Sequence, residues 1–135
     1  MPEKLSFGKT FYALEKAISI AQQRNAVITS NISNLDTPGY KSKDINFKSE
    51  LAKALETNHQ NGLVRTNPRH ISMQNNGGQM IEPYEEQGEW NGYNWANIDS
   101  EMTKLTENNL VYRTAVEALL RKMNLLKEVI REGGR

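Results

Sequence analysis

The sequence N-I-S-N-L-D-T-P-G-Y-K-S-K-D-I-N-F at residues 31–47 decides how this chain is organised. Pro38 has no backbone N–H and disfavours a helical conformation at Thr37, so a helix that precedes it must end here. Pro38 and Gly39 fit the two central positions of a type II turn, in which Gly39 takes a positive φ. Pro-Gly alone is typical of any helix terminator. The whole stretch, rich in short polar side chains that can bind free backbone groups, predicts a helix, a tight turn and a change of direction.

Two long amphipathic segments flank a polar middle. In each, apolar residues recur in alternating steps of three and four, the heptad spacing of packed helices. The first segment, residues 5–36, carries this stripe at Phe11, Leu14, Ile18, Asn25, Ile28 and Ile32. The second, residues 98–132, carries it at Met102, Leu105, Asn109, Tyr112, Val116, Leu119, Met123 and Leu126. We expect Asp99 to cap the second helix and Gly133-Gly134 to end it.

One asparagine interrupts each stripe. If the helices lie antiparallel with Leu35 beside Ile98, Asn25 and Asn109 fall within about one turn of each other. A polar residue in an apolar seam lowers stability but can fix the register. We therefore expect the two asparagines to pair, directly or through neighbouring layers, although two asparagines in long stripes can also coincide by chance. The apolar faces are wider than two helices can bury, which favours burial against other subunits or a third helix of the same chain.

Residues 37–97 form the polar middle segment. It contains a short amphipathic stretch at 47–56, which predicts a helix with Asn46 as its cap, and weak alternation at 62–73, which predicts extended pieces. The fold class is therefore mainly α: an antiparallel coiled-coil pair of long terminal helices, with a short helix and an irregular or β-like middle. The length, 135 residues, is that of a single domain.

Composition excludes several classes of function. The chain has 17 basic and 16 acidic residues, so its near-zero net charge does not favour a nucleic-acid partner. It has no cysteine, and therefore neither disulfides nor thiol chemistry. Residues 1–16 lack the apolar core of a secretory signal peptide. No run approaches the ~18 apolar residues that a membrane-spanning helix needs, so no membrane insertion is expected.

Candidate chemistry is sparse. His59 and His70 are the only histidines, and neither has a second His or Cys at ligand spacing, so no metal site is expected. Glu85, Glu86 and Glu89 lie in a polar stretch without an apolar pocket, which favours a solvated loop over a catalytic pair. We expect no catalytic residue and no cofactor. The aromatic residues of the middle segment could stack on a sugar, so a module that binds or cleaves peptidoglycan or another sugar is the second interpretation; more often such residues pack on their own helices or on a neighbour.

The complete turn resembles the signature of the bacterial flagellar rod, hook and hook-basal-body protein family, N-x-x-N-x-x-T-P-G-Y/F-K. The matching residues are Asn31, Asn34, Thr37, Pro38, Gly39, Tyr40 and Lys41. The stretch T-N-P-R-H-I at 66–71 and the lead-in N-G-Y-N at 91–94 are similar to the short proximal-rod members, although Asn91 stands where they have Asp. Another rod subunit of the same family is the nearest alternative.

The resemblance implies a structural subunit with one rod-type domain over residues 1–135. It implies export of the unfolded chain by the flagellar type III apparatus, and helical assembly in the periplasmic, extracytoplasmic part of the basal body. Implied partners are further copies of the chain, other rod proteins of the FlgC and FliE types, the MS ring and the export gate. Such a subunit connects the MS ring to the distal rod and transmits torque.

Overall fold

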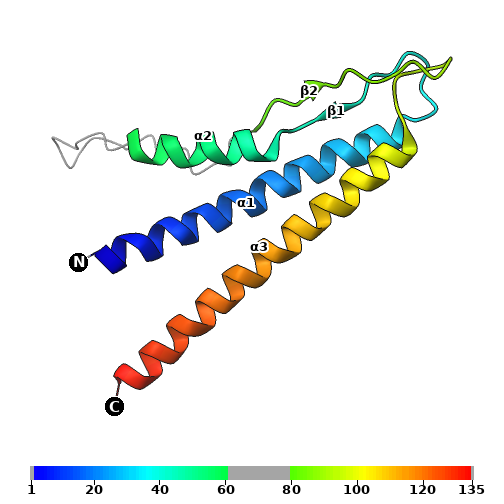
Figure 1. Cartoon of the computed structure of the whole chain (residues 1–135). Coiled ribbons are helices and arrows are strands. Elements are labelled where there is room, and N and C mark those ends of the chain that lie inside the picture. The colour runs from blue at the N-terminus through cyan, green and yellow to red at the C-terminus, as the bar shows by residue number, and fades with distance from the viewer. Residues whose placement is uncertain (1, 61–79, 135) are drawn as a thin grey trace.

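The computed structural model of the chain describes residues 2–60 and 80–134. Its elements are α1 (Pro2–Ser33), β1 (Lys43–Asp44), α2 (Phe47–Gln60), β2 (Tyr84–Glu85) and α3 (Ile98–Gly133). α1 and α3 run antiparallel, meet at one end of an elongated molecule, and diverge towards the end that holds both termini (Figure 1). α2 lies along the other side of α1, which therefore contacts both helices. The mainly α class with two long terminal helices is confirmed. The extended pieces expected at 62–73 fall outside the described residues.

The first helix ends at Ser33, before the expected end at residue 36. The N–H of Asn34 donates to the carbonyls of both Ser30 and Asn31, each at 3.1 Å, so the last turn tightens from α-type to 3₁₀-type bonds. The side chain of Asn34 also donates to the Ser30 carbonyl at 2.8 Å. Local side-chain bonding thus unwinds the helix before the proline forces it to stop.

The turn after α1 has the expected geometry. Gly39 has φ 69°, and the N–H of Tyr40 donates to the carbonyl of Thr37 at 3.3 Å, which closes a turn around Pro38 and Gly39. The N–H of Gly39 donates to the carbonyl of Tyr93 at 3.0 Å, so the turn also contacts the segment that leads into α3.

α2 begins where the sequence predicted. The side-chain oxygen of Asn46 accepts the N–H of Ser49 at 3.1 Å, which confirms Asn46 as the cap. The helix continues beyond residue 56 to Gln60.

The expected cap of α3 is wrong. Asn97, not Asp99, caps the helix: its side-chain oxygen accepts the N–H groups of Asp99 at 2.9 Å and Ser100 at 3.3 Å. Asn97 has the extended backbone that an N-cap needs, with φ −128° and ψ 117°, whereas Asp99 is already helical. At the other end the helix stops at Gly133 with Gly134 as its C-cap, as expected.

The middle segment contains a small antiparallel sheet. Lys43 pairs with Glu85 and Asp44 with Tyr84. The N–H of Glu86 donates to the carbonyl of Ser42 at 2.9 Å, which extends the pairing by one bond. β1 contacts α1, so this short sheet ties both sides of the middle segment to the first helix.

The buried line of α3 lies one position away from the expected stripe. The buried residues are Glu101, Asn108 and Ala115, whereas Met102, Asn109 and Val116 were expected. Glu101 is 1% exposed and Met102 48%. Short or polar side chains occupy the positions nearest to α1, where the backbones come close, and the bulky apolar side chains lie to either side.

Candidate functional site: the closed end and the helix seam

The closed end of the molecule comprises residues 31–45 and 84–104, and Asn31 lies at its centre. Its side-chain amide donates to the carbonyl of Lys43 at 2.7 Å and to Glu101 Oε2 at 2.9 Å. Its Oδ1 accepts the hydroxyl of Tyr40 and the N–H of Lys43, both at 3.0 Å. Two donors and two acceptors are the full capacity of an asparagine side chain. Asn31, which is 0% exposed, therefore joins α1 to β1, to the turn and to α3.

A buried carboxylate holds the start of α3. Glu101 accepts from Asn31 and from Lys104 Nζ, the latter at 2.9 Å, and Lys104 also bonds to Glu86. Burial lowers the pKa of Lys104, but its hydrogen bonds to Glu86 and Glu101 outweigh this, so the pKa is raised. The ammonium group therefore stays charged. A buried carboxylate is tolerated only when paired and hydrogen-bonded, as Glu101 is here.

A second ion pair joins β1 to the middle of α1. Arg24 donates through Nε and Nη2 to the two carboxylate oxygens of Asp44, each at 2.8 Å. This two-pronged geometry suits a planar guanidinium, and the hydrogen bond to Asp44 raises the pKa of Arg24. Asp44 is buried and also accepts the N–H of Ile45 at 2.7 Å. The strand is thus anchored to α1 by charge as well as by backbone contacts.

The segment leading into α3 binds the free carbonyls at the end of α1. Asn94, which is fully buried, donates to the carbonyls of Leu35 at 2.6 Å and Thr37 at 3.3 Å. The Tyr93 hydroxyl donates to the carbonyl of Asp36 at 2.8 Å. A helix end leaves carbonyls without intrahelical partners, and here a distant part of the chain supplies the donors.

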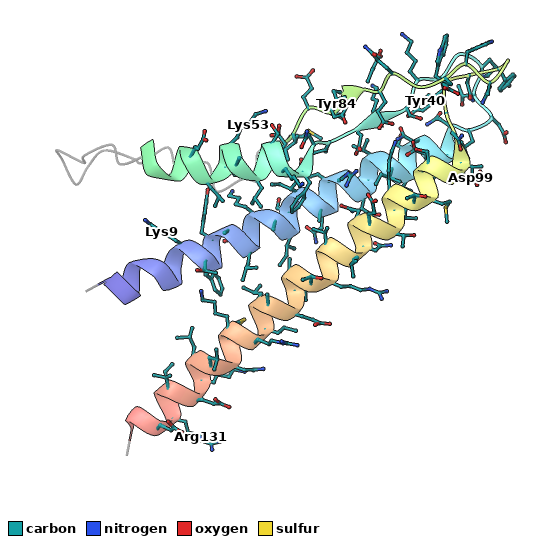
Figure 2. All side chains as sticks on the ribbon, in the orientation of Figure 1. Lys9, Tyr40, Lys53, Tyr84, Asp99 and Arg131 are labelled. Atoms are coloured by element: carbon teal, nitrogen blue, oxygen red, sulfur yellow. The ribbon has the colours of Figure 1, made fainter. Side chains whose placement is uncertain are left out.

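The aromatic residues of the middle segment pack within the chain. The rings of Trp90 and Trp95 lie 4.4 Å apart at 55°, and Lys41 Nζ lies 5.6 Å from the Trp95 ring centre. Lys41 also lies 3.6 Å from a carboxylate oxygen of Glu85. Gly88 is in close contact with this group, because a Cβ there would lie 2.6 Å from the carbonyl oxygen of Trp95. Figure 2 shows Tyr40 and Asp99 at this end, with Lys9 and Arg131 towards the other.

The signature residues divide into two groups. Asn31 and Tyr40 build the interior of the closed end, whereas Thr37, Pro38 and Gly39 are exposed and set the direction of the chain. Asn34 supports the turn, since its side-chain oxygen accepts the Thr37 hydroxyl at 3.0 Å. Lys41 is exposed.

The residues predicted for the helix seam differ widely in burial. Ile28 is buried. Half-buried are Phe11, Leu14, Ile18, Ile32, Leu105, Tyr112, Val116 and Leu119, and exposed are Asn25, Met102, Asn109, Met123 and Leu126.

The two seam asparagines lie close together but outside the core. Asn25 and Asn109 line the same pocket of about 320 Å³, together with Asn108, Ala21 and Tyr112. Within the described residues the structure records no hydrogen bond between their side chains. Asn108 makes the polar contact across the seam instead, donating to the carbonyl of Ala21 at 2.8 Å, and its Oδ1 has no partner among the described groups. The polar contact across the seam thus comes from Asn108, next to the expected Asn109, and it reaches the backbone of α1 instead of Asn25.

The open end comprises α1 up to residue 16 and α3 from residue 116, where the helices diverge (Figure 1). No α3 residue described beyond Ala115 is buried. Large apolar side chains are exposed there: Leu120, Met123, Leu125, Leu126, Val129 and Ile130. The surplus apolar face predicted from the sequence is therefore concentrated on α3 from Leu120 to Ile130.

The described residues contain no group of three or more His, Cys, Asp or Glu placed to hold a metal ion, and none of their helices could cross a membrane. The side chain of His59, together with His70 and the stretch at 66–71, lies outside the described part of the chain.

Sequence reasoning missed the residues that hold the closed end together. The hydrophobic pattern gave no packing role to Arg24, Asn94, Glu101, Lys104 or Asn108. One signal was present: Glu101 and Asn108 lie seven residues apart on α3. A polar heptad of this kind is recognisable as a buried line only when its partner helix is known.

Comparison with known proteins places this architecture in a class. A family model described as "Flagella basal body rod protein" matches residues 11–41, which cover most of α1 and the turn. The flagellar basal body rod protein FlgB of Bacillus subtilis (strain 168) is 33% identical over 132 residues, covering 94% of this chain and 97% of that protein. FlgB of Aeromonas hydrophila is 31% identical, covering 94% and 96%, and FlgB of Escherichia coli (strain K12) is 30% identical, covering 98% and 99%.

The class is therefore that of the flagellar basal-body rod proteins, structural subunits in which terminal helices pack on each other. The chain belongs to the FlgB family within that class. A module that binds or cleaves sugars is not supported.

Proposed function

We propose that this chain is a subunit of the proximal rod that assembles helically with further copies of itself and with FlgC-type and FliE-type rod proteins. In that position it connects the MS ring and the export gate to the distal rod and transmits torque. One observation carries the proposal: polar contacts within the chain hold the closed end together, whereas the open end leaves six large apolar side chains of α3 exposed. A contiguous apolar face of this kind is typical of a surface that binds protein.

The division between the ends suits a load-bearing subunit. The Arg24–Asp44 ion pair joins α1 to β1, and Asn31 joins both of them to α3, so these contacts fix the relative positions of the three elements. At the open end, burial against neighbours would stabilise the assembly by roughly 25 cal/mol for each Å² of apolar surface removed from water. The signature turn and the predicted seam residues would then orient the helices rather than act on a substrate.

The proposal includes the route and location of the subunit. The chain would be exported unfolded by the type III apparatus and would act in the periplasmic, extracytoplasmic part of the basal body, as one rod-type unit without catalysis. Family membership supports this location. The acidic residues near β2 support the absence of catalysis, because Glu85 and Glu86 are engaged in ion pairs with Lys41 and Lys104.

The test replaces two exposed apolar residues of the open end. Leu125→Asp with Val129→Asp should leave export unchanged but abolish incorporation into purified basal bodies and swimming. The matched control, Asn124→Ala, lies in the same exposed part of α3 and should assemble normally. Crosslinking in native basal bodies followed by mass spectrometry should identify FlgC-type and FliE-type neighbours. Normal incorporation of the double Asp variant would overturn the proposed role of this face.

A further inference from the structure

The two ends of the molecule carry opposite charge. All six charged residues between positions 82 and 101 are acidic: Glu82, Glu85, Glu86, Glu89, Asp99 and Glu101. The end of α3, residues 121–133, carries four basic and two acidic residues and is therefore weakly basic. Arg121, Lys127 and Arg131 are exposed there. The acidic segment lies at the closed end and the basic one at the open end (Figure 1). One chain cannot bring them into contact, but two copies placed head to tail can.

The acidic end contains a pocket of about 500 Å³. Its lining includes Glu86, Glu89, Trp90 and Ser42. Within the chain, Lys104 pairs with Glu86, whereas Glu89 has no ion pair among the residues that the structure describes. The pocket also borders the first turn of α3, but Asp99 in that turn offsets the positive end of the helix dipole. Lys104 and Lys41 offset part of the acidic charge around the pocket, and the Glu89 carboxylate remains available to a cation.

An unpartnered hydroxyl in the pocket wall is independent evidence for a ligand. Ser42 is 3% exposed, and its Oγ has no hydrogen-bond partner among the described groups. Buried polar groups are nearly always hydrogen-bonded, so this oxygen fits a donor supplied from outside the chain. The Ser42 carbonyl is already engaged, by the N–H of Glu86 at 2.9 Å.

The aromatic wall indicates what kind of donor fits. Lys41 Nζ lies over the ring of Trp95, so this indole already attracts a cation within the chain. The neighbouring Trp90 is 53% exposed. A planar guanidinium can stack on an indole while its N–H groups bond to a carboxylate and a hydroxyl, which a lysine ammonium does less well.

We propose that this pocket binds Arg131 of a second copy of the chain, with Glu89, Trp90 and Ser42 as its receptors. Arg131 is exposed in the last turn of α3, and Lys127, one turn earlier, adds positive charge on the same face. The contact joins two different surfaces, so it propagates along an assembly instead of closing a dimer. The inference rests on the proposed helical assembly and specifies one of its contacts.

Site-directed disulfides test the contact directly, because the chain has no native cysteine. One copy carries Gln87→Cys beside the pocket, and a co-expressed copy carries Glu132→Cys beside Arg131. Purified basal bodies treated with a mild oxidant should show the mixed dimer. The control pair, Gln87→Cys with Glu117→Cys at the middle of α3, should not. If both copies are present in the basal bodies and the first pair yields no dimer, the contact is wrong while the proposed function stands.

Charge reversal supplies the second test. Glu89→Lys and Arg131→Glu should each reduce the 87–132 crosslink roughly three- to tenfold, as expected for a partly exposed ion pair with an aromatic partner. The double variant should restore it, because the charges are then exchanged. Reversals at exposed sites away from the pocket, Glu56→Lys and Arg113→Glu, should leave it unchanged. A double variant that crosslinks no better than either single variant would overturn the proposal.

Discussion

The closed and open ends of this molecule are built from the same two helices and differ in what covers them. At the closed end, α1 and α3 are joined by polar groups: Asn31 bonds to Glu101 at 2.9 Å, and Asn94 binds the carbonyl of Leu35 at 2.6 Å. At the open end the helices separate (Figure 1). Apolar side chains such as Leu125 and Val129 are exposed there.

The difference shows that one subunit can have a fixed geometry at one end and an uncovered apolar face at the other. Buried polar networks give one arrangement when every group is satisfied, because alternative arrangements leave groups unpaired. Apolar faces are less selective, since they gain free energy from burial against any complementary surface. The closed end therefore sets the geometry of the subunit, and the open end leaves its stabilisation to neighbours.

The largest expected loss of stability comes from a charge introduced into the fully buried part of the helix seam. Ile28 is fully buried, so Ile28→Asp should destabilise the isolated chain by about 4 kcal/mol or more, because an unpaired carboxylate is desolvated there. Backbone amide hydrogen exchange should lose protection throughout the closed end. Ile130→Asp is the control, since Ile130 is exposed. Equal loss of protection in both variants would contradict the division between the ends.

Removing the central asparagine should have the next largest effect. Asn31→Ala leaves Glu101 without one of its donors and the N–H and carbonyl of Lys43 without their side-chain partners. We expect a loss of roughly 3 kcal/mol, the range for breaking a buried hydrogen-bonded charge network. Hydrogen exchange of the Lys43 amide is the measurement: its protection should be lost in Asn31→Ala. Asn109→Ala, at an exposed position, is the control. Retained protection at Lys43 would show that the sheet does not depend on Asn31.

A smaller effect is expected at the turn. Gly39 has φ 69°, a conformation that a β-branched residue adopts only with strain, so Gly39→Val should cost about 1–3 kcal/mol. A Cβ at this position meets no atom within 4 Å, so the cost comes from the backbone alone. Secretion of the variant should survive while its incorporation into basal bodies fails. If Gly39→Val builds functional rods, turn geometry is not what the position requires.

The smallest effect on the isolated chain should come from the open end. Leu125→Asp replaces an exposed side chain, so the stability of the free subunit should change by no more than about 0.5 kcal/mol. Assembly should nevertheless fail, because the new charge would be buried against a neighbour. Circular dichroism of the purified chain and the yield of basal bodies separate the two results. A variant that loses its helical signal in isolation would show that this face is already packed within the subunit.

Local sequence was sufficient for several features. The geometry of Pro38 predicted the turn, and the capping side chain of Asn46 predicted the start of α2. The two glycines at 133 and 134 predicted the end of α3. These depend on interactions within a few residues, so the sequence carries them explicitly. The cap of α3 was missed by two positions, because Asn97 and Asp99 are both good capping residues and only the backbone conformation distinguishes them.

The existence of two long helices, a turn between them and a surplus apolar face was thus determined by the sequence itself, through heptad spacing and the chemistry of Pro38-Gly39. Which side of α3 is buried was decided only by the tertiary structure. Glu101 is buried because Asn31, 70 residues earlier, and Lys104 satisfy its carboxylate, and Asn108 because the Ala21 carbonyl accepts its amide. A hydrophobicity pattern assigns such residues to the surface, since their burial is favourable only when partners distant in sequence are already in place.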